Sequence, residues 1–243
     1  MIHNDIAIEF KKVCYEVNDL SILNNVSGVF YNGKITTLVG PSGAGKTSLL
    51  KMCNGLHSPT SGDIYIFNKP ITTYEPTALR TNVGIVLQSS PIIRGTVFEN
   101  LALPFKLKNK TLLEKEAIAF LEDVGLDRTF LYRQGRDLSG GQQQKVSIAR
   151  TLMNQPNILL LDEITSALDP TSVQEIEQLL LNINKKYKTT IIWITHNIEQ
   201  AKRIGDYTWM MMEGQLVESG ESKRLWSTSN DFIQTITLGG QEV

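Results

Sequence analysis

The stretch Gly40-Pro41-Ser42-Gly43-Ala44-Gly45-Lys46-Thr47 stands between a short apolar run at residues 35–39 and a run typical of a helix that begins at Ser48. Its pattern is G-x-x-x-x-G-K-[ST]. Glycines let backbone N–H groups approach an anion without obstruction by a Cβ atom, and a following helix directs the positive end of its dipole at the same place. The sequence therefore predicts a strand, a phosphate-binding loop and a helix.

The expected phosphate site comprises Gly40, Pro41, Ser42, Gly43, Ala44, Gly45, Lys46, Thr47 and Ser48. Within it, Lys46 is predicted to reach the β- and γ-phosphates, and the Thr47 hydroxyl to hold Mg²⁺. A plain glycine-rich turn between a strand and a helix is the alternative, but it leaves the Lys-Thr pair unexplained. The motif thus predicts that a nucleoside triphosphate binds with Mg²⁺.

The composition of the chain argues against several classes of protein. The 24 basic and 25 acidic residues of the 243-residue chain nearly cancel, so no general electrostatic footprint for nucleic acid is expected. Two cysteines, Cys14 and Cys53, are too few for a disulfide framework or a cysteine-based zinc site, and we expect buried reduced thiols. No apolar run approaches the roughly 20 residues that span a bilayer. We expect a soluble, cytoplasmic protein whose membrane role depends on another chain.

Hydrophobic patterning predicts an α/β fold. Alternating or clustered apolar runs at residues 6–10, 13–17, 22–30 and 63–67 indicate an antiparallel β-layer that precedes and follows the phosphate loop. Continuously apolar runs at residues 35–39, 83–87, 158–161 and 190–195 are typical of a mostly parallel sheet buried on both faces. Residues 206–212 and 215–218 suggest a final hairpin, with short helices after it.

We expect one domain over residues 1–243. Residues of about 1–90 and 156–243 are predicted to form the β-layer and the core around the phosphate loop. Helix formers dominate residues 96–132, with apolar residues at helical spacing over 112–124 and a stop at Gly125. We therefore place an inserted helical subdomain at about residues 91–155.

Polar residues end three of the predicted buried strands, at the edge of an open α/β sheet where ligands collect. Asp162 can bind Mg²⁺ and Glu163 can polarise an attacking water; two ordinary solvated acids are the alternative for this pair alone. His196 could contact the γ-phosphate or orient the water, or be structural. Gln88 could contact Mg²⁺ or water, although a single glutamine is weak support.

A second anion-binding device follows in the run Leu138-Ser139-Gly140-Gly141-Gln142. Ser139 has the properties of an N-cap, and the two glycines expose the backbone at a helix N-terminus. One chain holds a single Lys-Thr phosphate loop, so this second device is expected to face a nucleotide held by another copy. A helix cap without further function is the alternative.

Together these motifs resemble the ATP-binding cassette (ABC) transporter ATPases. The resemblance extends from about residue 6 to residue 218 and rests on the order and spacing of residues 40–47, Gln88, residues 138–142, residues 158–163, Ser166-Ala167-Leu168-Asp169 and His196. It implies a dimer in which Ser139 and Gly141 of one copy close on the ATP bound at Lys46 of the other.

The same resemblance implies roles for single residues: Glu163 as general base, His196 as a switch residue, Gln88 as the link to a membrane partner, and Asp169 as a contact across the dimer. Separate membrane permease subunits would then be the partners, at the inner face of the cell membrane. A cassette ATPase that acts on nucleic acid or the ribosome is the alternative, but such relatives typically carry two cassettes, a long coiled coil or a zinc module.

Two departures from the family pattern matter. Tyr15 is the aromatic residue nearest to the position expected to stack on adenine, but the usual spacing selects Val17, so a core tyrosine remains an alternative. Ile164 stands where many members have proline. The local sequence around Ile164, together with the runs Leu103-Pro104-Phe105 and Trp193-Ile194-Thr195-His196, resembles that of subunits of iron-export and plant aluminium-tolerance transporters. This closer resemblance implies export of a metal or other inorganic ion.

Overall fold

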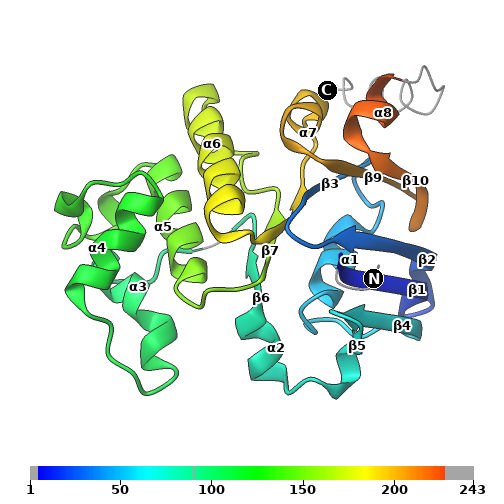
Figure 1. The fold of residues 1–243 in the computed structure, drawn as a ribbon, viewed down its shortest axis with the longest axis horizontal. Coiled ribbons are helices and arrows are strands. Elements are labelled where there is room, and N and C mark those ends of the chain that lie inside the picture. Colours follow the sequence, from blue (N-terminus) through cyan, green and yellow to red (C-terminus); the bar gives the residue numbers. More distant parts are fainter. Residues whose placement is uncertain (1–4, 90, 228–243) are drawn as a thin grey trace.

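Two β-sheets enclose the helix that follows the phosphate loop (Figure 1). The computed structural model describes residues 5–89 and 91–227. One sheet is antiparallel, with strands in the order β2 (Leu20–Tyr31), β1 (Ile6–Val17), β4 (Ser61–Ile66) and β5 (Lys69–Pro70). The second has the order β10 (Gln215–Glu221), β9 (Tyr207–Met212), β3 (Ile35–Val39), β8 (Thr190–Ile194), β7 (Ile158–Asp162) and β6 (Val83–Val86). The predicted α/β fold, with an antiparallel layer and a mostly parallel sheet, is confirmed.

The central strands β7 and β8 are buried at every position. Along β7 the side chains alternate between two cores: Leu159 and Leu161 pack with the helices, whereas Ile158 and Leu160 pack with α1 (Lys46–Met52) and the antiparallel sheet. A strand covered on both faces must be apolar at successive positions. This explains the uninterrupted apolar run that precedes Asp162.

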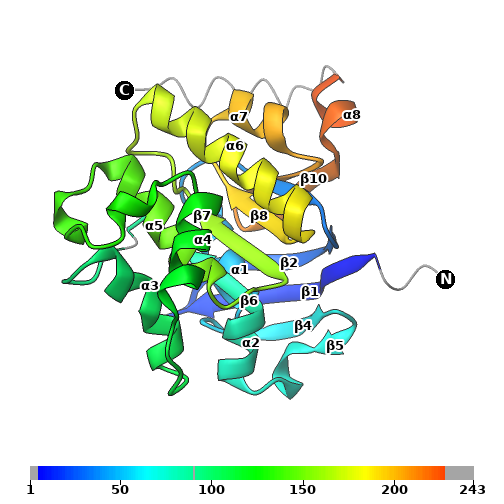
Figure 2. The same ribbon diagram turned by 60° about the vertical axis from the view of Figure 1, so that its left-hand side comes forward.

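The remaining helices cover the outer face and the ends of the large sheet (Figures 1 and 2). They are α2 (Pro76–Asn82), α3 (Val97–Lys106), α4 (Glu114–Asp123), α5 (Gly140–Leu152), α6 (Pro170–Tyr187), α7 (Ile198–Ile204) and α8 (Ser222–Ser227), with short 3₁₀ turns η1 (Ile71–Thr73), η2 (Arg128–Phe130) and η3 (Gly135–Asp137). We call α3, α4 and α5 the helical lobe. It occupies the segment where the sequence predicts helices.

Local sequence signals set the boundaries of these helices. Thr96 and Glu99 form a reciprocal capping box at the start of α3. Asp169 caps α6, whose first residue is Pro170, a position where the missing N–H of proline is harmless. Gly125, predicted to stop the second helix of the lobe, has a φ of 68°. That helix begins at Glu114, two residues later than the apolar spacing predicts.

Some boundaries differ from the prediction. The two N-terminal runs are one strand, β1, because a bulge with Lys12 at φ 51° lets pairing with β2 resume at Val13. Helices α2 and α7 are short, and neither is among the elements predicted from the sequence. The predicted C-terminal helices include α8, but residues 228–243 lie outside the described part of the chain.

Other expectations concern thiols and membranes. Cys14 and Cys53 are both free; Cys53 is buried as expected, whereas Cys14 is half-buried. Within residues 5–89 and 91–227, no helix combines the length and apolarity that a membrane span requires.

Candidate functional site

The phosphate loop connects the end of β3 to the first residue of α1, Lys46. Gly40 and Gly45 have φ angles of 149° and 89°. A Cβ atom on Gly40 would lie 2.0 Å from the carbonyl oxygen of Met211, and one on Gly45 would lie 2.6 Å from Leu23 Cδ2. Both backbone conformation and space therefore require glycine at these positions.

A cavity of about 390 Å³ opens at this loop. The residues that line it come from the loop, from β2 and from two strand ends: Ile22, Ser42, Gly43, Ala44, Gly45, Lys46, Thr47, Ser48, Glu163 and His196. Glu163 and His196 lie more than 100 residues from the loop in sequence. The structure thus brings together the phosphate loop and two of the residues predicted to act on it.

The Lys46 ammonium is held inside the loop. Its Nζ donates hydrogen bonds to the carbonyl oxygens of Gly40 and Pro41, each at 2.8 Å. Burial lowers the pKa of Lys46, and the negative charges of Glu163 and Asp162 oppose that shift. The loop's own carbonyls and two acidic side chains therefore fix a cation at the cavity.

Thr47 and Asp162 meet beside the lysine. The Thr47 hydroxyl donates to Asp162 Oδ1 at 3.0 Å, which joins α1 to the end of β7. Burial raises the pKa of the Asp162 carboxyl; the Thr47 hydrogen bond opposes the shift, and the charge of Glu163 adds to it. A hydroxyl and a carboxylate oxygen side by side are the ligand types that Mg²⁺ prefers.

Glu163 adopts a left-handed backbone conformation, with φ of 50°. Such a conformation costs a non-glycine residue about 1–2 kcal/mol, so the surroundings must impose it. Its amide donates to the Ile194 carbonyl at 3.1 Å, and its carbonyl accepts from the Ser166 amide at 3.1 Å and the Ser166 hydroxyl at 2.9 Å. These bonds direct the side chain into the cavity, where Oε1 lies 2.6 Å from His196 Nε2.

Gln88 reaches the same turn from the end of β6. Its Nε2 donates to the Ser166 hydroxyl at 3.0 Å. The exposed Gln88 side chain is therefore tied to the loop that holds Glu163, whereas it has no contact of this kind with Thr47 or Asp162 in the described part of the chain. Its predicted role toward Mg²⁺ or water stays a prediction.

Tyr15 lies on β1 opposite Leu23, and its ring stacks on His57 with centroids 5.2 Å apart and an interplanar angle of 26°. It does not line the phosphate cavity among the described residues. His57 thus has an aromatic partner. No local sequence signal could find this pair, because the two residues lie on elements far apart in the chain.

Ser139 and Gln142 form a reciprocal capping box at the start of α5. The Gln142 amide donates to Ser139 Oγ at 3.3 Å, and the Ser139 amide donates to Gln142 Oε1 at 3.0 Å. A Cβ atom on Gly141 would lie 2.7 Å from Ser172 Oγ, so glycine lets α5 approach α6. Within the described chain, the phosphate cavity is lined by none of Ser139, Gly140, Gly141 and Gln142. Figure 1 shows α5 well apart from α1.

Sequence comparisons identify similar proteins. A sequence model of the family described as ABC transporter matches residues 23–166. The putative ABC transporter ATP-binding protein YjkB of Bacillus subtilis (strain 168) is 45% identical over 206 residues, covering 85% of this chain and 82% of YjkB. The methionine import ATP-binding protein MetN of Histophilus somni (strain 129Pt) is 40% identical over 222 residues, covering 88% of this chain and 64% of MetN.

Solved structures are similar as well. cbiO1 from Clostridium perfringens, part of the ABC transporter complex cbiONQ, has a TM-score of 0.84 at 30% identity, covering 96% of this chain and 95% of that chain. The dimeric bacterial ABC transporter cassette MJ0796 has a TM-score of 0.77 at 31% identity, covering 88% of this chain and 98% of that chain. MJ0796 has also been solved as a dimer in a post-hydrolysis state bound to ADP and Pi.

Replacing Asp162 by Asn tests the electrostatic cost of the site. Because folding raises the pKa of Asp162, the folded protein binds a proton there more tightly, and stability falls as the pH rises from the unfolded value of about 4 through the folded pKa. We expect Asp162→Asn to increase the free energy of unfolding at neutral pH, without nucleotide or Mg²⁺, and to lose this advantage in acid.

Asp169→Asn is the matched control, with the opposite sign. Hydrogen bonds from Ser172 and Thr171 lower the pKa of Asp169, so its carboxylate stabilises the fold above the unfolded pKa and loses this effect as the pH falls through the folded pKa. We expect Asp169→Asn to lower stability at neutral pH. Chemical denaturation at several pH values measures both; a loss of stability in Asp162→Asn would contradict the account.

Proposed function

Because the chain belongs to the ABC transporter family and is an ATPase of that family, we propose that it is the ATP-hydrolysing subunit of a transporter, in which two copies enclose ATP and drive separate membrane subunits. The observation that carries this proposal is the 2.6 Å contact between Glu163 and His196, which both line the phosphate cavity. It supports Glu163 as the base, because this carboxylate lines the same cavity as the phosphate loop.

The residues at the cavity fit a magnesium nucleotide. Gly40 and Gly45 let the loop backbone pack against Met211 and Leu23 in conformations that a side chain would prevent, and the loop's own carbonyls hold the Lys46 ammonium. Thr47 and Asp162 would hold Mg²⁺, which, when bound, neutralises charge on the phosphate oxygens. Gln88 keeps its predicted role toward the metal or the water, supported by its contact with the turn that holds Glu163.

Each residue then has a defined task in hydrolysis. Lys46 exchanges its two carbonyl partners for oxygens of the β- and γ-phosphates. Glu163 accepts a proton from the water that attacks the γ-phosphorus, so that ADP and phosphate leave. His196 holds the Glu163 carboxylate through Nε2 and, as a residue that lines the cavity, would contact the γ-phosphate. Tyr15, beside β2, is the proposed adenine contact.

We place a second copy opposite the cavity. Its Ser139, Gly140, Gly141 and Gln142 would close on the γ-phosphate with the N-terminal end of α5, a 13-residue helix whose amides and dipole favour an anion. Asp169 would contact the partner across the dimer. Support comes from the separation of α5 from the phosphate loop within one chain and from the dimeric state of the similar cassette MJ0796.

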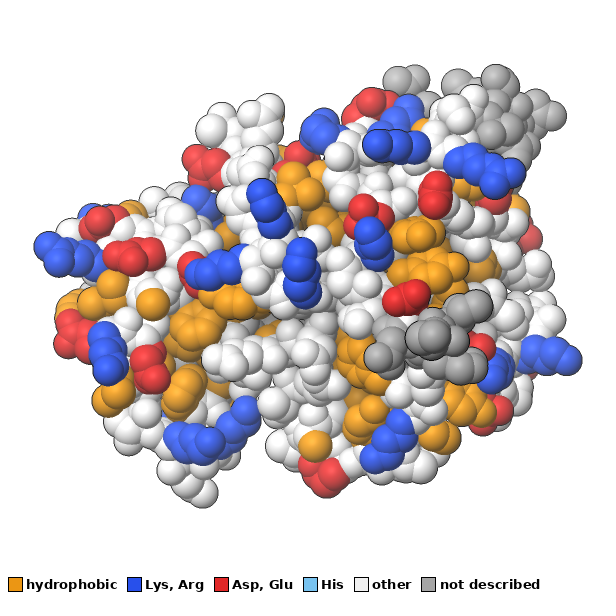
Figure 3. All heavy atoms as spheres, viewed as in Figure 1, with side chains coloured by type: hydrophobic (Ala, Val, Ile, Leu, Met, Phe, Trp, Pro, Cys, Tyr) orange, Lys and Arg blue, Asp and Glu red, His pale blue; other side chains and the backbone are white. Residues whose placement is uncertain are grey.

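Membrane subunits are the proposed partners, so the chain would lie at the inner, cytoplasmic face of a membrane. The helical lobe and the turns beside it expose large hydrophobic side chains at Ile93, Leu107, Leu113 and Tyr132. Figure 3 shows hydrophobic side chains over this lobe, with basic and acidic side chains interspersed rather than gathered by sign. Such a face suits a protein partner better than nucleic acid.

For the transported solute we propose a metal or other inorganic ion moved by export, on the basis of Ile164 and the runs at residues 103–105 and 193–196 described above. Import is the second candidate, because MetN is named as a methionine import protein and is 40% identical. Whether the solute is exported or imported, this chain itself would not contact it.

Glu163→Gln tests the base. The amide oxygen of glutamine can still accept the His196 hydrogen bond while it cannot take a proton, so we expect ATP binding to persist and turnover to fall by at least about a hundredfold. Light scattering with size exclusion should detect a dimer trapped by ATP and Mg²⁺. Glu199→Gln, at an exposed position on α7, should hydrolyse ATP as the parent does. A parental rate in Glu163→Gln would overturn the assignment.

Purification of the tagged chain from native membranes tests the partner. We expect a polytopic membrane protein to copurify in fixed stoichiometry, and mass spectrometry to identify it. Recovery of ribosomes or DNA in place of a membrane protein would overturn the transporter assignment in favour of a cassette ATPase that acts on nucleic acid.

A further inference from the structure

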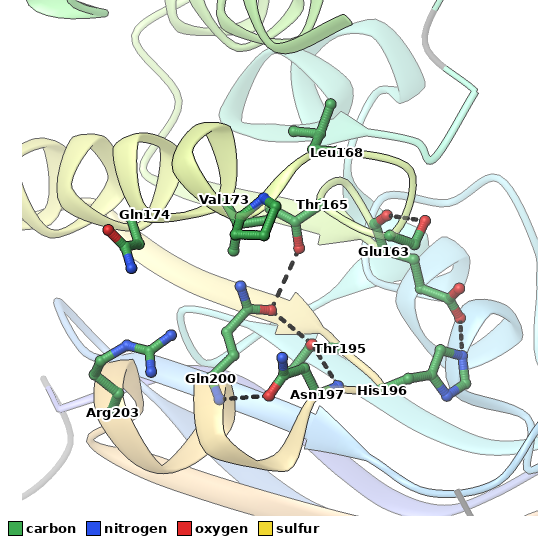
Figure 4. Close-up of a pocket in the computed structure, with 12 residues that line it drawn as sticks. Glu163, Thr165, Leu168, Val173, Gln174, Thr195, His196, Asn197, Gln200 and Arg203 are labelled. Atoms are coloured by element: carbon green, nitrogen blue, oxygen red, sulfur yellow. Dashed lines mark hydrogen bonds and ion pairs between the residues drawn. The ribbon is translucent and has the colours of Figure 1, made fainter. Parts of the chain in front are cut away.

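A buried hydrogen-bond network lies beside Glu163 and His196 (Figure 4). It lines a second cavity, of about 580 Å³, which shares these two residues with the phosphate cavity. Gln200, on α7, is its centre and is 1% exposed. Four residues bond to Gln200, namely Glu177 on α6 and Thr165, Thr195 and Asn197 on two loops, although none of the motifs in the sequence includes Gln200.

The orientation of the Gln200 amide follows from its partners. Nε2 donates to Glu177 Oε1 at 2.9 Å, and a carboxylate can only accept at this position. Oε1 therefore faces the other way, where it accepts from the Thr195 hydroxyl at 2.6 Å and the Thr165 hydroxyl at 3.3 Å. The Gln200 side chain therefore donates to a residue on α6 and accepts from residues on two separate loops.

On one side the network fixes the segment that carries His196. Thr195 precedes His196 and donates to the Gln200 side chain. Asn197 follows His196. The backbone amide of Asn197 donates to Thr195 Oγ1 at 3.0 Å, and its side-chain Oδ1 accepts from the backbone amide of Gln200 at 2.9 Å. Both neighbours of His196 are thus bonded to Gln200.

On the other side it fixes the turn that carries Glu163. Thr165 lies two residues after Glu163, within the turn that Ser166 closes on the Glu163 carbonyl. Thr165 is buried, so its hydroxyl needs a partner inside the protein, and Gln200 Oε1 is that partner. One glutamine side chain therefore links the two loops whose residues meet at 2.6 Å.

Glu177 and Arg203 anchor the network. Arg203 Nε donates to Glu177 Oε2 at 2.8 Å and Nη2 donates to Oε1 at 2.6 Å, a bidentate pair. The Glu177 side chain is 6% exposed and that of Arg203 is 53% exposed. The hydrogen bonds that Arg203 donates to Glu177 raise the pKa of Arg203. The buried carboxylate is therefore compensated, and it offers Gln200 a fixed acceptor.

We propose that Gln200 is a positioning residue for ATP hydrolysis, which sets the distance between Glu163 and His196 by holding both of their loops against the Glu177–Arg203 pair. This inference rests on the roles proposed above for Glu163 and His196. Misplacement of reacting groups by about 1 Å can lower a rate by about a hundredfold, so loss of this link should appear in kcat. The phosphate loop has no bond to Gln200, so ATP binding should not change.

Gln200→Met removes both hydrogen-bonding groups and keeps the length of the side chain. We expect kcat to fall about tenfold or more, with the KM for ATP within about twofold of the parent. The matched control is Thr208→Val. Thr208 is a fully buried hydroxyl bonded to Thr37 and Ser222, away from both cavities, and its loss should lower the melting temperature without lowering kcat. Equal kcat values in the two variants would overturn the proposal.

A swap of donor and acceptor gives a second, independent measurement. Gln200→Glu alone places two carboxylates against each other, and kcat should fall. Glu177→Gln alone measures the cost of weakening the pair with Arg203. Combining it with Gln200→Glu restores a donor opposite an acceptor while position 200 still accepts from both threonine hydroxyls, so the double variant should be faster than the two single losses multiplied together. Single losses that simply multiply would contradict the proposed link.

Glu163→Gln, assayed in parallel, separates this inference from the proposed function. Loss of turnover in Glu163→Gln together with parental kcat in Gln200→Met would overturn only the role of Gln200. Parental turnover in Glu163→Gln would overturn the assignment of the base, on which the role of Gln200 depends.

Discussion

The parallel register of β3, β8 and β7 is the constraint on which the site depends. Ile194 is aligned with Leu38 on one side and with Asp162 on the other, so three strands end at one level. Two backbone hydrogen bonds continue this alignment past the strands, from Glu163 to Ile194 and from Thr195 to Leu38. The phosphate loop, the acidic pair and His196 therefore leave the sheet together. A shift of one residue in any strand would turn the polar ends away from each other.

The site works against the stability of the fold around it. Burial disfavours the charged forms of Lys46 and Asp162, and Glu163 occupies a left-handed backbone conformation. These costs are tolerable because the sheet beneath packs against a hydrophobic core on each face, and burial of that apolar surface stabilises the fold. The rigid sheet holds these strained and buried groups in their orientation before ATP arrives. This is preorganisation, which favours catalysis because the groups need not be reoriented during the reaction.

The sequence predicts those parts of the molecule that are determined by local residue patterns. Buried strands appear as continuous apolar runs, and a strand, glycines and Lys-Thr in succession specify the phosphate loop. What it misses depends on contacts across elements: the bulge at Lys12 that joins two apolar runs into β1, the stacking of Tyr15 on His57, and the bonds from Gln200 to Glu177 and Thr195. A glutamine in a short helix has no distinctive local signal, because its function resides in partners up to 35 residues away.

The central claim is that each ATP site is completed by another copy of the chain, and complementation tests it most directly. Lys46→Ala removes the phosphate contact, and Ser139→Asp retains a helix cap but opposes the γ-phosphate with a negative charge. Each variant alone should be inactive. In an equimolar mixture, half of the dimers combine one intact Lys46 with one intact Ser139 from the partner, so about a quarter of the parental ATPase activity should return. A mixture no more active than the sum of the separate variants would contradict the account.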